Sequence, residues 1–445
     1  MNKILLIILF NFTLIIGQSV DATMTIYKNR LALIKQPVSW VIENKSSEIE
    51  YGTIPEGIKE STPYLNLSNG TVLNQKLNKN IFSEYKLFKN SLGSSITITT
   101  IDDEDQFGTL ISISPEGYTL QTRRDVIYIK KDHIKQISLR KIINNPRTSP
   151  VLQWDVLSET NNISGNLVYM AGGFEWSAMY RMEIIDNGFA TLIPEAYISN
   201  KSNISFDNLK INLVEGDLGD YQINNIRSNR KLSSLSRNNE MATQIGNESA
   251  LGDYHIYDYS KRLSFGSNEH VSVRLYESRK VKYSKTYVFQ NGEKRQKEEP
   301  LEIEFQIKNT LDNNLNIPLP QGRIALYEYV NSALEFIGDD NIKQTPKGDL
   351  LTIRAGRSFD VIGKRIVVNF DRQRKSEEAS IEITINNTKD EDINIRLEEK
   401  ISGDWVIKES STNYIKKDAT TIHFPLSLSK GNKAKVNYTY RKEWN

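Results

Sequence analysis

LEIEFQI, residues 301–307, places Leu, Ile, Phe and Ile at every second position, with Glu and Gln between them. Successive side chains of a strand point to opposite faces, so this pattern predicts an antiparallel strand with one buried face and one wet face. The same alternation occurs in SITITTI at 95–101 and in IEITI at 381–385. Sustained helical periodicity is nearly absent. The sequence therefore predicts a mainly β protein built of several antiparallel β-sandwich modules.

A small barrel is predicted near the N-terminus, at about 83–140. The pattern of residues 107–139 indicates short strands at 109–114, 118–123, 126–130 and 134–139, with a Pro-Glu-Gly turn at 115–117. Short bent strands joined in this way resemble the Sm-like and SH3-like barrels. In the cytoplasm such a barrel would suggest RNA, but the chain has 57 Lys and Arg against 55 Asp and Glu. We therefore expect a structural barrel and no nucleic-acid partner.

Two polar segments divide the remaining chain. Residues 224–250 are rich in Asn and Ser and lack alternation, which predicts a mobile loop. NGEKRQKEEP at 291–300 is a charge run that ends in proline, which indicates an exposed linker and a domain boundary. The expected organisation is a signal peptide at 1–22, an N-terminal β module at 23–145 that contains the small barrel, a central β-sandwich at 146–290 and a C-terminal immunoglobulin-like β-sandwich at 300–445.

The first 22 residues, MNKILLIILFNFTLIIGQSVDA, indicate export. One cation, Lys3, precedes an apolar run from Ile4 to Ile16, which is shorter than the roughly 20 residues of a membrane span. Small residues at Gly17 and Ala22 complete the pattern of a secretory signal peptide. We expect a periplasmic or extracellular protein with no transmembrane segment in its mature chain; an uncleaved anchor is the alternative. The chain has no cysteine, which excludes disulfides and thiol nucleophiles.

Several stretches, taken in order, resemble a known family. They are YKNRLALIK at 27–35, GFEWSAMY at 173–180, GDYHIY at 252–257, LPQGRIALY at 319–327, FIG at 336–338 and GRSFD at 356–360. Together they resemble the domain of unknown function 4139 family, and the resemblance covers most of the mature chain. Longer relatives, the mucoidy-inhibitor-A-like proteins, carry a coiled coil where this chain has the small barrel and no heptads. The resemblance implies an exported, mainly β bacterial protein and supplies no activity or catalytic residue.

His255 and His270, within the stretch 252–275, are the first candidates for a site, because imidazole titrates near neutral pH. Turn-forming residues at 265–269 predict a hairpin, which would place His270 opposite Ser264. The two imidazoles would then be about 30 Å apart. Alternation assigns His270 to the polar, exposed face, whereas His255 has aromatic neighbours. We therefore expect a hairpin rather than a metal or catalytic site.

Motifs for metal binding and catalysis are missing from the sequence. It contains no His-Glu-x-x-His, and His133 and His423 stand alone. Acidic clusters at 102–105, 215–220, 338–340 and 389–392 do not follow a calcium-loop spacing and predict solvated turns, with Asp217 and Asp220 the first choice for calcium. Neither a nucleophile elbow nor a phosphate-binding glycine loop occurs. We predict no catalytic residue, no cofactor and no metal.

Tryptophans are the remaining candidates, since an exposed indole can stack on a sugar. Trp154 and Trp176 have apolar neighbours and are expected in the core. Trp405, just after Gly403 and Asp404, is the best candidate for an exposed platform. The sequence thus predicts an exported envelope protein with a non-catalytic binding or assembly role, whose partner is an envelope protein or a glycan. The alternative is a hydrolase of cell-wall or extracellular polysaccharide, which needs two carboxylates about 5 to 9.5 Å apart.

Overall fold

The computed structural model describes residues 22–79, 81–140, 146–147, 149–186, 188–215, 248–251 and 254–444. The chain is mainly β, as predicted, and α1 (Glu84–Lys89) is the one α-helix among these residues. No helix in the described ranges is long and apolar enough to cross a membrane. The expected signal peptide, apart from its last residue, and most of the expected mobile loop lie outside the described residues.

Sheets A and B come mostly from the first half of the chain. Sheet A has the order β16-β17-β15-β1-β2-β12-β4, with β16 (Glu248–Leu251), β17 (Tyr254–Phe265), β15 (Phe206–Glu215), β1 (Thr23–Tyr27), β2 (Leu31–Val41), β12 (Asn162–Gly172) and β4 (Tyr64–Leu67). Sheet B has the order β3-β11-β5, with β3 (Ser46–Tyr51), β11 (Val151–Leu157) and β5 (Thr71–Asn78). β1 is parallel to β15, and the other neighbours are antiparallel.

Sheet D joins distant parts of the chain. Its order is β18-β14-β13-β22-β23, with β19 also paired to β14; the strands are β18 (Glu269–Arg274), β14 (Phe189–Asn200), β13 (Phe174–Asp186), β22 (Gly322–Val330), β23 (Ala333–Ile342) and β19 (Arg279–Lys282). β22 runs parallel to β13. A segment from the last third of the chain therefore completes a sheet that begins near residue 174.

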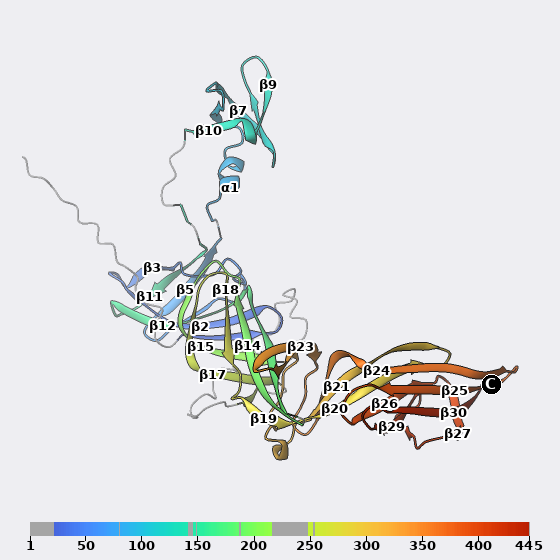
Figure 1. Cartoon of the computed structure of the whole chain (residues 1–445). Coiled ribbons are helices and arrows are strands. Elements are labelled where there is room, and N and C mark those ends of the chain that lie inside the picture. Colours follow the sequence, from blue (N-terminus) through green and yellow to red (C-terminus); the bar gives the residue numbers. More distant parts are fainter. Residues whose placement is uncertain are drawn as a thin grey trace, which may run out of the picture.

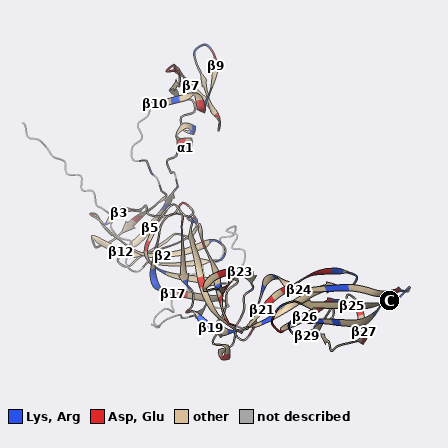
Figure 2. Cartoon of the chain, viewed as in Figure 1, with Lys and Arg blue, Asp and Glu red and all other residues tan. Residues whose placement is uncertain are grey.

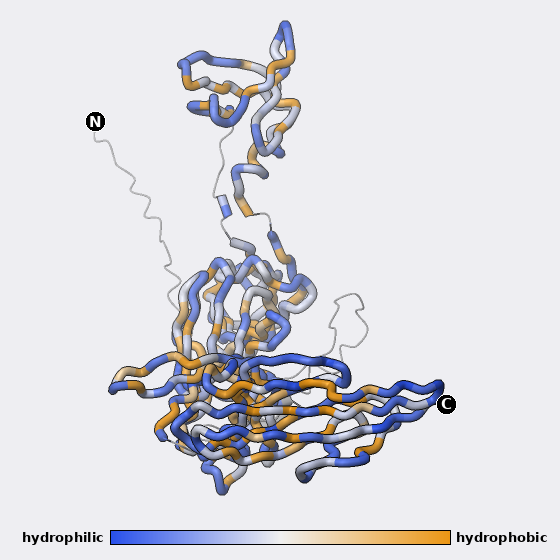
Figure 3. Tube along the Cα trace, turned by 45° about the vertical axis from the view of Figure 1, so that its right-hand side comes forward, coloured by the Kyte–Doolittle hydropathy of each residue, from blue (hydrophilic) through white to orange (hydrophobic). Residues whose placement is uncertain are grey.

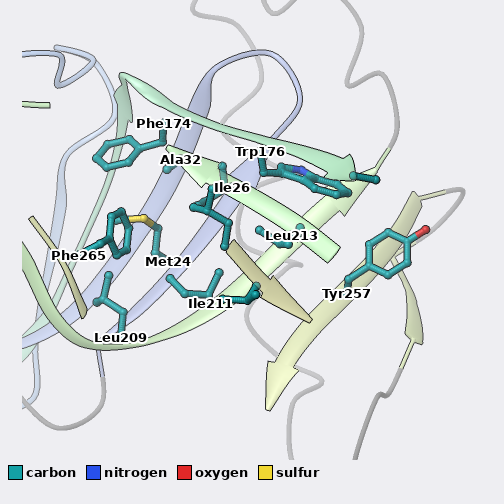
Figure 4. Packing of buried hydrophobic residues seen from close by; sticks show 14 of the residues in the cluster. Met24, Ile26, Ala32, Phe174, Trp176, Leu209, Ile211, Leu213, Tyr257 and Phe265 are labelled. Carbon is teal, nitrogen blue, oxygen red and sulfur yellow. The ribbon is translucent and has the colours of Figure 1, made fainter. Parts of the chain in front are cut away.

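One core lies among sheets A, B and D. Alternate residues of β13, beginning with Phe174 and Trp176, are buried, as a period of two requires. Figure 4 shows these two rings on either side of Ile26 of β1, in the same buried cluster as Ile211 and Leu213 of β15. The predicted burial of Trp176 is thus confirmed, and the residues that resemble the family in this stretch serve packing.

The predicted hairpin at 252–275 is wrong, although the turn is placed correctly. β17 pairs with β15 and β16 in sheet A, whereas β18 pairs with β14 in sheet D. Asn268, in the turn, has a φ of 55°, which its residue type tolerates. Phe265 and Val273 on either side of the turn are both buried in the shared core. The chain therefore crosses from one sheet to the other because both strands bury apolar side chains in the same core.

Sheet C is the small module predicted near the N-terminus. Its order is β10-β6-β7-β8-β9, with β10 (Ile134–Leu139), β6 (Ser95–Thr100), β7 (Asp105–Ile113), β8 (Gly117–Gln121) and β9 (Val126–Lys130). Phe88 of α1 packs with its apolar residues in a core of their own. β5 and β11, which flank this module in sequence, pair with each other, and Figure 1 shows sheet C apart from the other sheets. The likeness to Sm-like or SH3-like barrels stays a prediction.

Sheet E forms the C-terminal module. Its order is β27-β30-β25-β24-β21-β20-β26-β29-β28, with β27 (Asp404–Ser410), β30 (Lys433–Glu443), β25 (Ser376–Asn387), β24 (Leu350–Arg372), β21 (Lys297–Lys308), β20 (Ser284–Gly292), β26 (Ile393–Lys400), β29 (Thr421–Leu428) and β28 (Ile415–Lys416). Figure 3 shows hydrophobic and hydrophilic segments alternating along these strands. The immunoglobulin-like topology stays a prediction.

Sheet E parts between β20 and β21. Paired residues run from Ser284 with Gln306 to Val288 with Glu302. Beyond Val288, β20 continues beside β26, and β21 continues beside β24. Both halves of the sheet contribute to a second core, which contains Phe289. The two halves therefore face each other across that core.

The exposed linker expected at 291–300 is mostly strand instead, because residues 291–292 end β20 and residues 297–300 begin β21. Residues 293–296 connect the two strands of this β-hairpin, and the N–H of Arg295 donates a hydrogen bond to the carbonyl of Gly292 (3.2 Å). The expected module at 300–445 is also not separate, because β22 and β23 belong to sheet D. β24 is 23 residues long and is continuous between the two cores, with Ile353 in the first and Val361 in the second. A strand that long carries no local signal at the point where it leaves one core for the other.

Candidate functional site

The four histidines do not come together. His255 is half-buried on β17, and His270 is exposed on β18, as expected, where its ring stacks on Tyr197 with centroids 5.2 Å apart. His133 is exposed beside sheet C, and His423 lies on β29 of sheet E. Within the described ranges, no three His, Cys, Asp or Glu side chains are grouped so that they could hold a metal ion.

Where the structure describes the acidic clusters, some of their carboxylates bind protein groups. Asp340 accepts a hydrogen bond from a backbone N–H of β24 (2.8 Å), and Asp392 accepts one from the N–H of Lys430 (2.9 Å). These contacts are typical of carboxylates that stabilise turns and strand ends. The first choice for calcium, Asp217 with Asp220, lies outside the described residues.

The tryptophans discussed above are buried. Trp154 is 1 %, Trp176 4 % and Trp405 5 % exposed. Each indole N–H donates a hydrogen bond inside the protein, to Gln75 Oε1 (2.7 Å), Val214 O (3.1 Å) and Ala419 O (2.8 Å) respectively. The expected exposed platform at Trp405 is therefore wrong. Its indole packs between β27 and the segment after β28, where it supplies a large apolar surface and one hydrogen-bond donor.

A groove lies where sheet E parts between β20 and β21. Its volume is about 360 Å³, which is near the lower end for sites that bind small molecules. Residues of β20 form one wall and residues of β21 and β24 form the other. The charged residues that line it are Arg295, Lys297, Glu299, Glu302, Arg354, Arg357 and Lys400. We call it the cationic groove.

The charge of the groove differs from that of the whole chain. Five cations against two carboxylates leave an excess of three positive charges in the groove, whereas all 445 residues carry a net charge of only +2. Figure 2 shows Lys and Arg interspersed with Asp and Glu over the strands. A concave surface with one sign of charge focuses the field and attracts counter-ions. The groove therefore favours an anionic ligand.

Some of these cations are paired within the protein. Lys297 contacts Glu299, and Arg357 lies 3.2 Å from the other oxygen of that carboxylate. Burial acts to raise the pKa of Glu299, but hydrogen bonds and charges from Lys297 and Arg357 outweigh it and hold the pKa below its ordinary value. Arg354 lies 3.9 Å from Glu304, which is buried behind it. These side chains form a charged lining held in place by its own contacts.

Arg295 and Lys400 differ from these paired cations. Both are exposed, and in the described part of the chain neither side chain has an ion pair or a hydrogen bond. Both adjoin Gly292, because the N–H of Arg295 donates to its carbonyl and Lys400 is its partner in the β20–β26 register. Two cations therefore meet at one end of the groove with their hydrogen-bonding capacity unused, and an anionic group there would receive charge-assisted bonds.

A buried cluster fixes the hairpin connection next to these cations. Arg365, which is fully buried, donates to the carbonyls of Glu293 (2.9 Å) and Arg295 (2.6 Å). Its Nε is 2.9 Å from Glu399 Oε2, and Tyr438 donates its hydroxyl hydrogen to the same oxygen. Burial raises the pKa of Glu399, against the effects of Arg365 and of the hydrogen bonds. The backbone of Arg295 is thus held by a buried guanidinium.

Asn291 connects this cluster with the groove. It lines the groove, is 5 % exposed, and donates through Nδ2 to Glu399 Oε1 (2.7 Å). Its Oδ1 has no hydrogen-bond donor among the described residues. A buried acceptor without a donor is uncommon and costs about 1–3 kcal/mol. The atom has almost no solvent-accessible surface, so a molecule bound in the groove does not reach it.

Two carboxyl groups in or beside the groove have shifted pKa values, Glu299 and Glu399. A glycosidase needs a carboxyl group with a raised pKa as its general acid. The pKa of Glu299 is lowered. Glu399 is 1 % exposed and is bonded to Arg365, Tyr438 and Asn291, so it has no free access to a substrate. Neither of these two carboxyl groups is therefore placed as the general acid of a glycosidase.

The groove was missed in the sequence because its cations come from three separate stretches, at 295–297, 354–357 and 400. Only the pairing of β26, β20, β21 and β24 brings these stretches together. The available signal was KRQK at 294–297, which has the composition of a solvated linker.

No protein family and no curated protein matches the chain. The resemblance to the domain of unknown function 4139 family therefore stays a prediction.

Proposed function

We propose that this chain is an exported, non-catalytic binding protein of the bacterial envelope and that the cationic groove holds an anionic ligand. The observation that carries the proposal is the pair of cations, Arg295 and Lys400, which have no partner among the described residues and lie at one end of a groove with excess positive charge. The signal-peptide pattern at 1–22 and the family resemblance support export.

The shape of the site favours a glycan over a protein as the partner. A stable protein interface takes about 800 Å² from each partner and is broad. The cationic groove is a hollow of about 360 Å³ between two strands, which suits a small group or a short saccharide. We therefore propose an anionic envelope glycan as the ligand, with an acidic envelope protein as the competing outcome.

Binding of heparin, a polyanion, by the mature chain tests this proposal, with neutral dextran for comparison. We expect binding to heparin that weakens as salt is added, because salt screens exposed charges. Replacing Arg295→Gln together with Lys400→Gln should lower the affinity by about tenfold or more, since a hydrogen bond to a charged group contributes about 1.5–3 kcal/mol. Arg295→Gln keeps the backbone carbonyl that Arg365 binds.

The matched control is Lys408→Gln with Lys433→Gln. Both lysines are exposed on sheet E and lie outside the groove lining, so the control removes the same charge elsewhere. An equal loss of affinity in both double variants, or none in the groove variant, would show that the groove is not the binding site.

Export is tested separately by cell fractionation and N-terminal sequencing. We expect a periplasmic or extracellular protein that begins at about Gln18 or Thr23, as the small residues before these positions indicate. Full-length chain that stays in the membrane after carbonate extraction would contradict export as a cleaved protein.

A further inference from the structure

We infer that the ligand of the cationic groove is a hydroxylated sugar acid, a hexuronate unit of an acidic glycan. This inference rests on the proposed anion binding and adds to it the identity of the anion. The groove presents a hydrogen-bond acceptor as well as cations, and the two kinds of group occupy different places along its length.

The cationic end lies at the hairpin connection. Arg295 and Lys400 both adjoin Gly292, and Asn291 is the next residue of β20. The other end lies four residues back along β20, where Val288 pairs with Glu302. At about 3.3 Å per residue the two ends are about 13 Å apart, which leaves room for a short saccharide.

The acceptor lies beyond the cations. The Glu302 carboxylate has no ion pair or hydrogen bond within the described residues, although Arg357 is its partner in the strand register. An ionised carboxylate accepts hydrogen bonds and donates none. This position therefore suits a ligand that brings donors.

This arrangement separates one class of anion from another. A dicarboxylate without hydroxyl groups would supply no donor to Glu302 and would bring a second negative charge toward it. A hexuronate combines one carboxylate, for Arg295 and Lys400, with several hydroxyl groups that can donate to Glu302. Its charge and its donors thus match both ends of the groove.

The walls of the groove are already in place for such a ligand. The Lys297 side chain is 10 % exposed, donates to the carbonyl of Gln290 (2.6 Å) and lies 4.7 Å above the ring of Phe289. Arg365 holds the hairpin connection on the other side. A site that needs little ordering on binding loses less conformational entropy.

Calorimetric titration of the mature chain with defined small ligands tests the inference. The probes are digalacturonate, a glucuronate-containing disaccharide, the neutral digalactoside, and adipate, which has two carboxylates and no hydroxyl. We expect at least one uronate disaccharide to bind about tenfold or more tightly than both the digalactoside and adipate, because each of these lacks one set of charge-assisted bonds. Comparison of monomeric galacturonate with polygalacturonate distinguishes a free sugar acid from a polymer.

Glu302→Ala provides a second measurement, with an outcome that unfolding of the variant would not produce. It should weaken uronate binding and strengthen adipate binding, since it removes an acceptor from one ligand and a repulsive charge from the other. The Lys408→Gln and Lys433→Gln control should change neither. Equal affinity of parent protein for adipate and uronates would overturn the sugar assignment and leave anion binding intact. Failure to bind any anion, heparin included, would overturn the proposed function as well.

Discussion

Arg365 of β24 and Glu399 of β26 form an ion pair, 2.9 Å from Nε to Oε2, in which neither side chain is more than 1 % exposed. The two strands belong to opposite halves of sheet E, so the pair connects the halves across their core. A buried charge is tolerated when its partners satisfy it. Because Arg365 also holds the carbonyl of Arg295, the same guanidinium links the stability of this core to the shape of the cationic groove.

Breaking this pair should destabilise the C-terminal module. Glu399→Ala leaves the guanidinium of Arg365 buried without its counter-charge, and such a loss costs about 3–5 kcal/mol. Denaturant unfolding monitored by tryptophan fluorescence measures the change. The control is Glu298→Ala, which removes an exposed ion pair with Lys364 and should change the unfolding free energy by less than about 1 kcal/mol. Similar unfolding curves for the two variants would contradict a supporting role for the buried pair.

Trp176→Ala should act on the fold. The indole is buried between sheets A and D, donates to the carbonyl of Val214, and has the ammonium of Lys28 3.7 Å from its ring centroid. Replacing a large buried side chain by alanine costs about 3–5 kcal/mol. Thermal unfolding is the measurement, with uronate binding as the second. A variant that melts with the parent yet loses its ligand would place this tryptophan in a binding site.

Local alternation predicted the strands well but could not predict their partners. LEIEFQI at 301–307 lies within β21, and IEITI at 381–385 lies within β25. The period of two reports which face of a strand is buried, but carries no information on which other strand buries it. For that reason β17 and β18 were expected to pair with each other, although they belong to different sheets.

The candidate site was unpredictable for a related reason. Arg295, Arg357 and Lys400 are far apart in sequence, and each lies in a stretch with ordinary strand or turn composition. Their proximity depends on the register of four strands and on the parting of β20 from β21. The burial of Trp405 was unpredictable for the same reason, because the segment that contacts its indole follows β28. The sequence indicated the fold class, whereas the groove can be recognised only from the topology of the strands.

Acid should weaken the C-terminal module in part through Glu293. Burial acts to raise the pKa of this carboxyl, but hydrogen bonds from Lys442 and Ser402 outweigh it and hold the pKa below its ordinary value of 4.5. A carboxyl with a depressed pKa in the folded state stabilises the fold above its unfolded pKa, and that stabilisation is lost as pH falls through the folded value. We expect Glu293→Gln to be less stable than the parent at neutral pH.

The difference between Glu293→Gln and the parent should shrink steadily below pH 4.5, the ordinary pKa of this carboxyl. Unfolding free energies of both proteins, measured at pH values from neutral to strongly acidic, give the comparison. Glu298→Gln serves as the control, because Glu298 is exposed and close to the same hairpin. A difference that stays constant down to the lowest pH would contradict the assigned role of Lys442 and Ser402.

A substitution at Gly322 tests whether β22, from the last third of the chain, pairs with β13 beside the first core. It begins β22 within LPQGRIALY at 319–327 and pairs in register with Ala178 of β13. A Cβ at this position would lie 2.1 Å from the carbonyl oxygen of Ala178, and because the obstacle is backbone, no side-chain rotation can relieve the contact. Gly322→Ala should therefore separate β22 from β13 and cost about 1–3 kcal/mol or more, as overpacking does.

Gly172→Ala on β12 is the matched control for this substitution. Its added Cβ would meet the nearest atom at 3.8 Å, and its φ is not in the left-handed region, so we expect a neutral change or a gain of up to about 1 kcal/mol from the less flexible unfolded chain. Hydrogen exchange of the β13 and β22 amides locates the effect. Loss of protection in Gly322→Ala alone would support the parallel pairing, whereas full protection in both variants would contradict it, and with it the continuity of sheet D across the two parts of the chain.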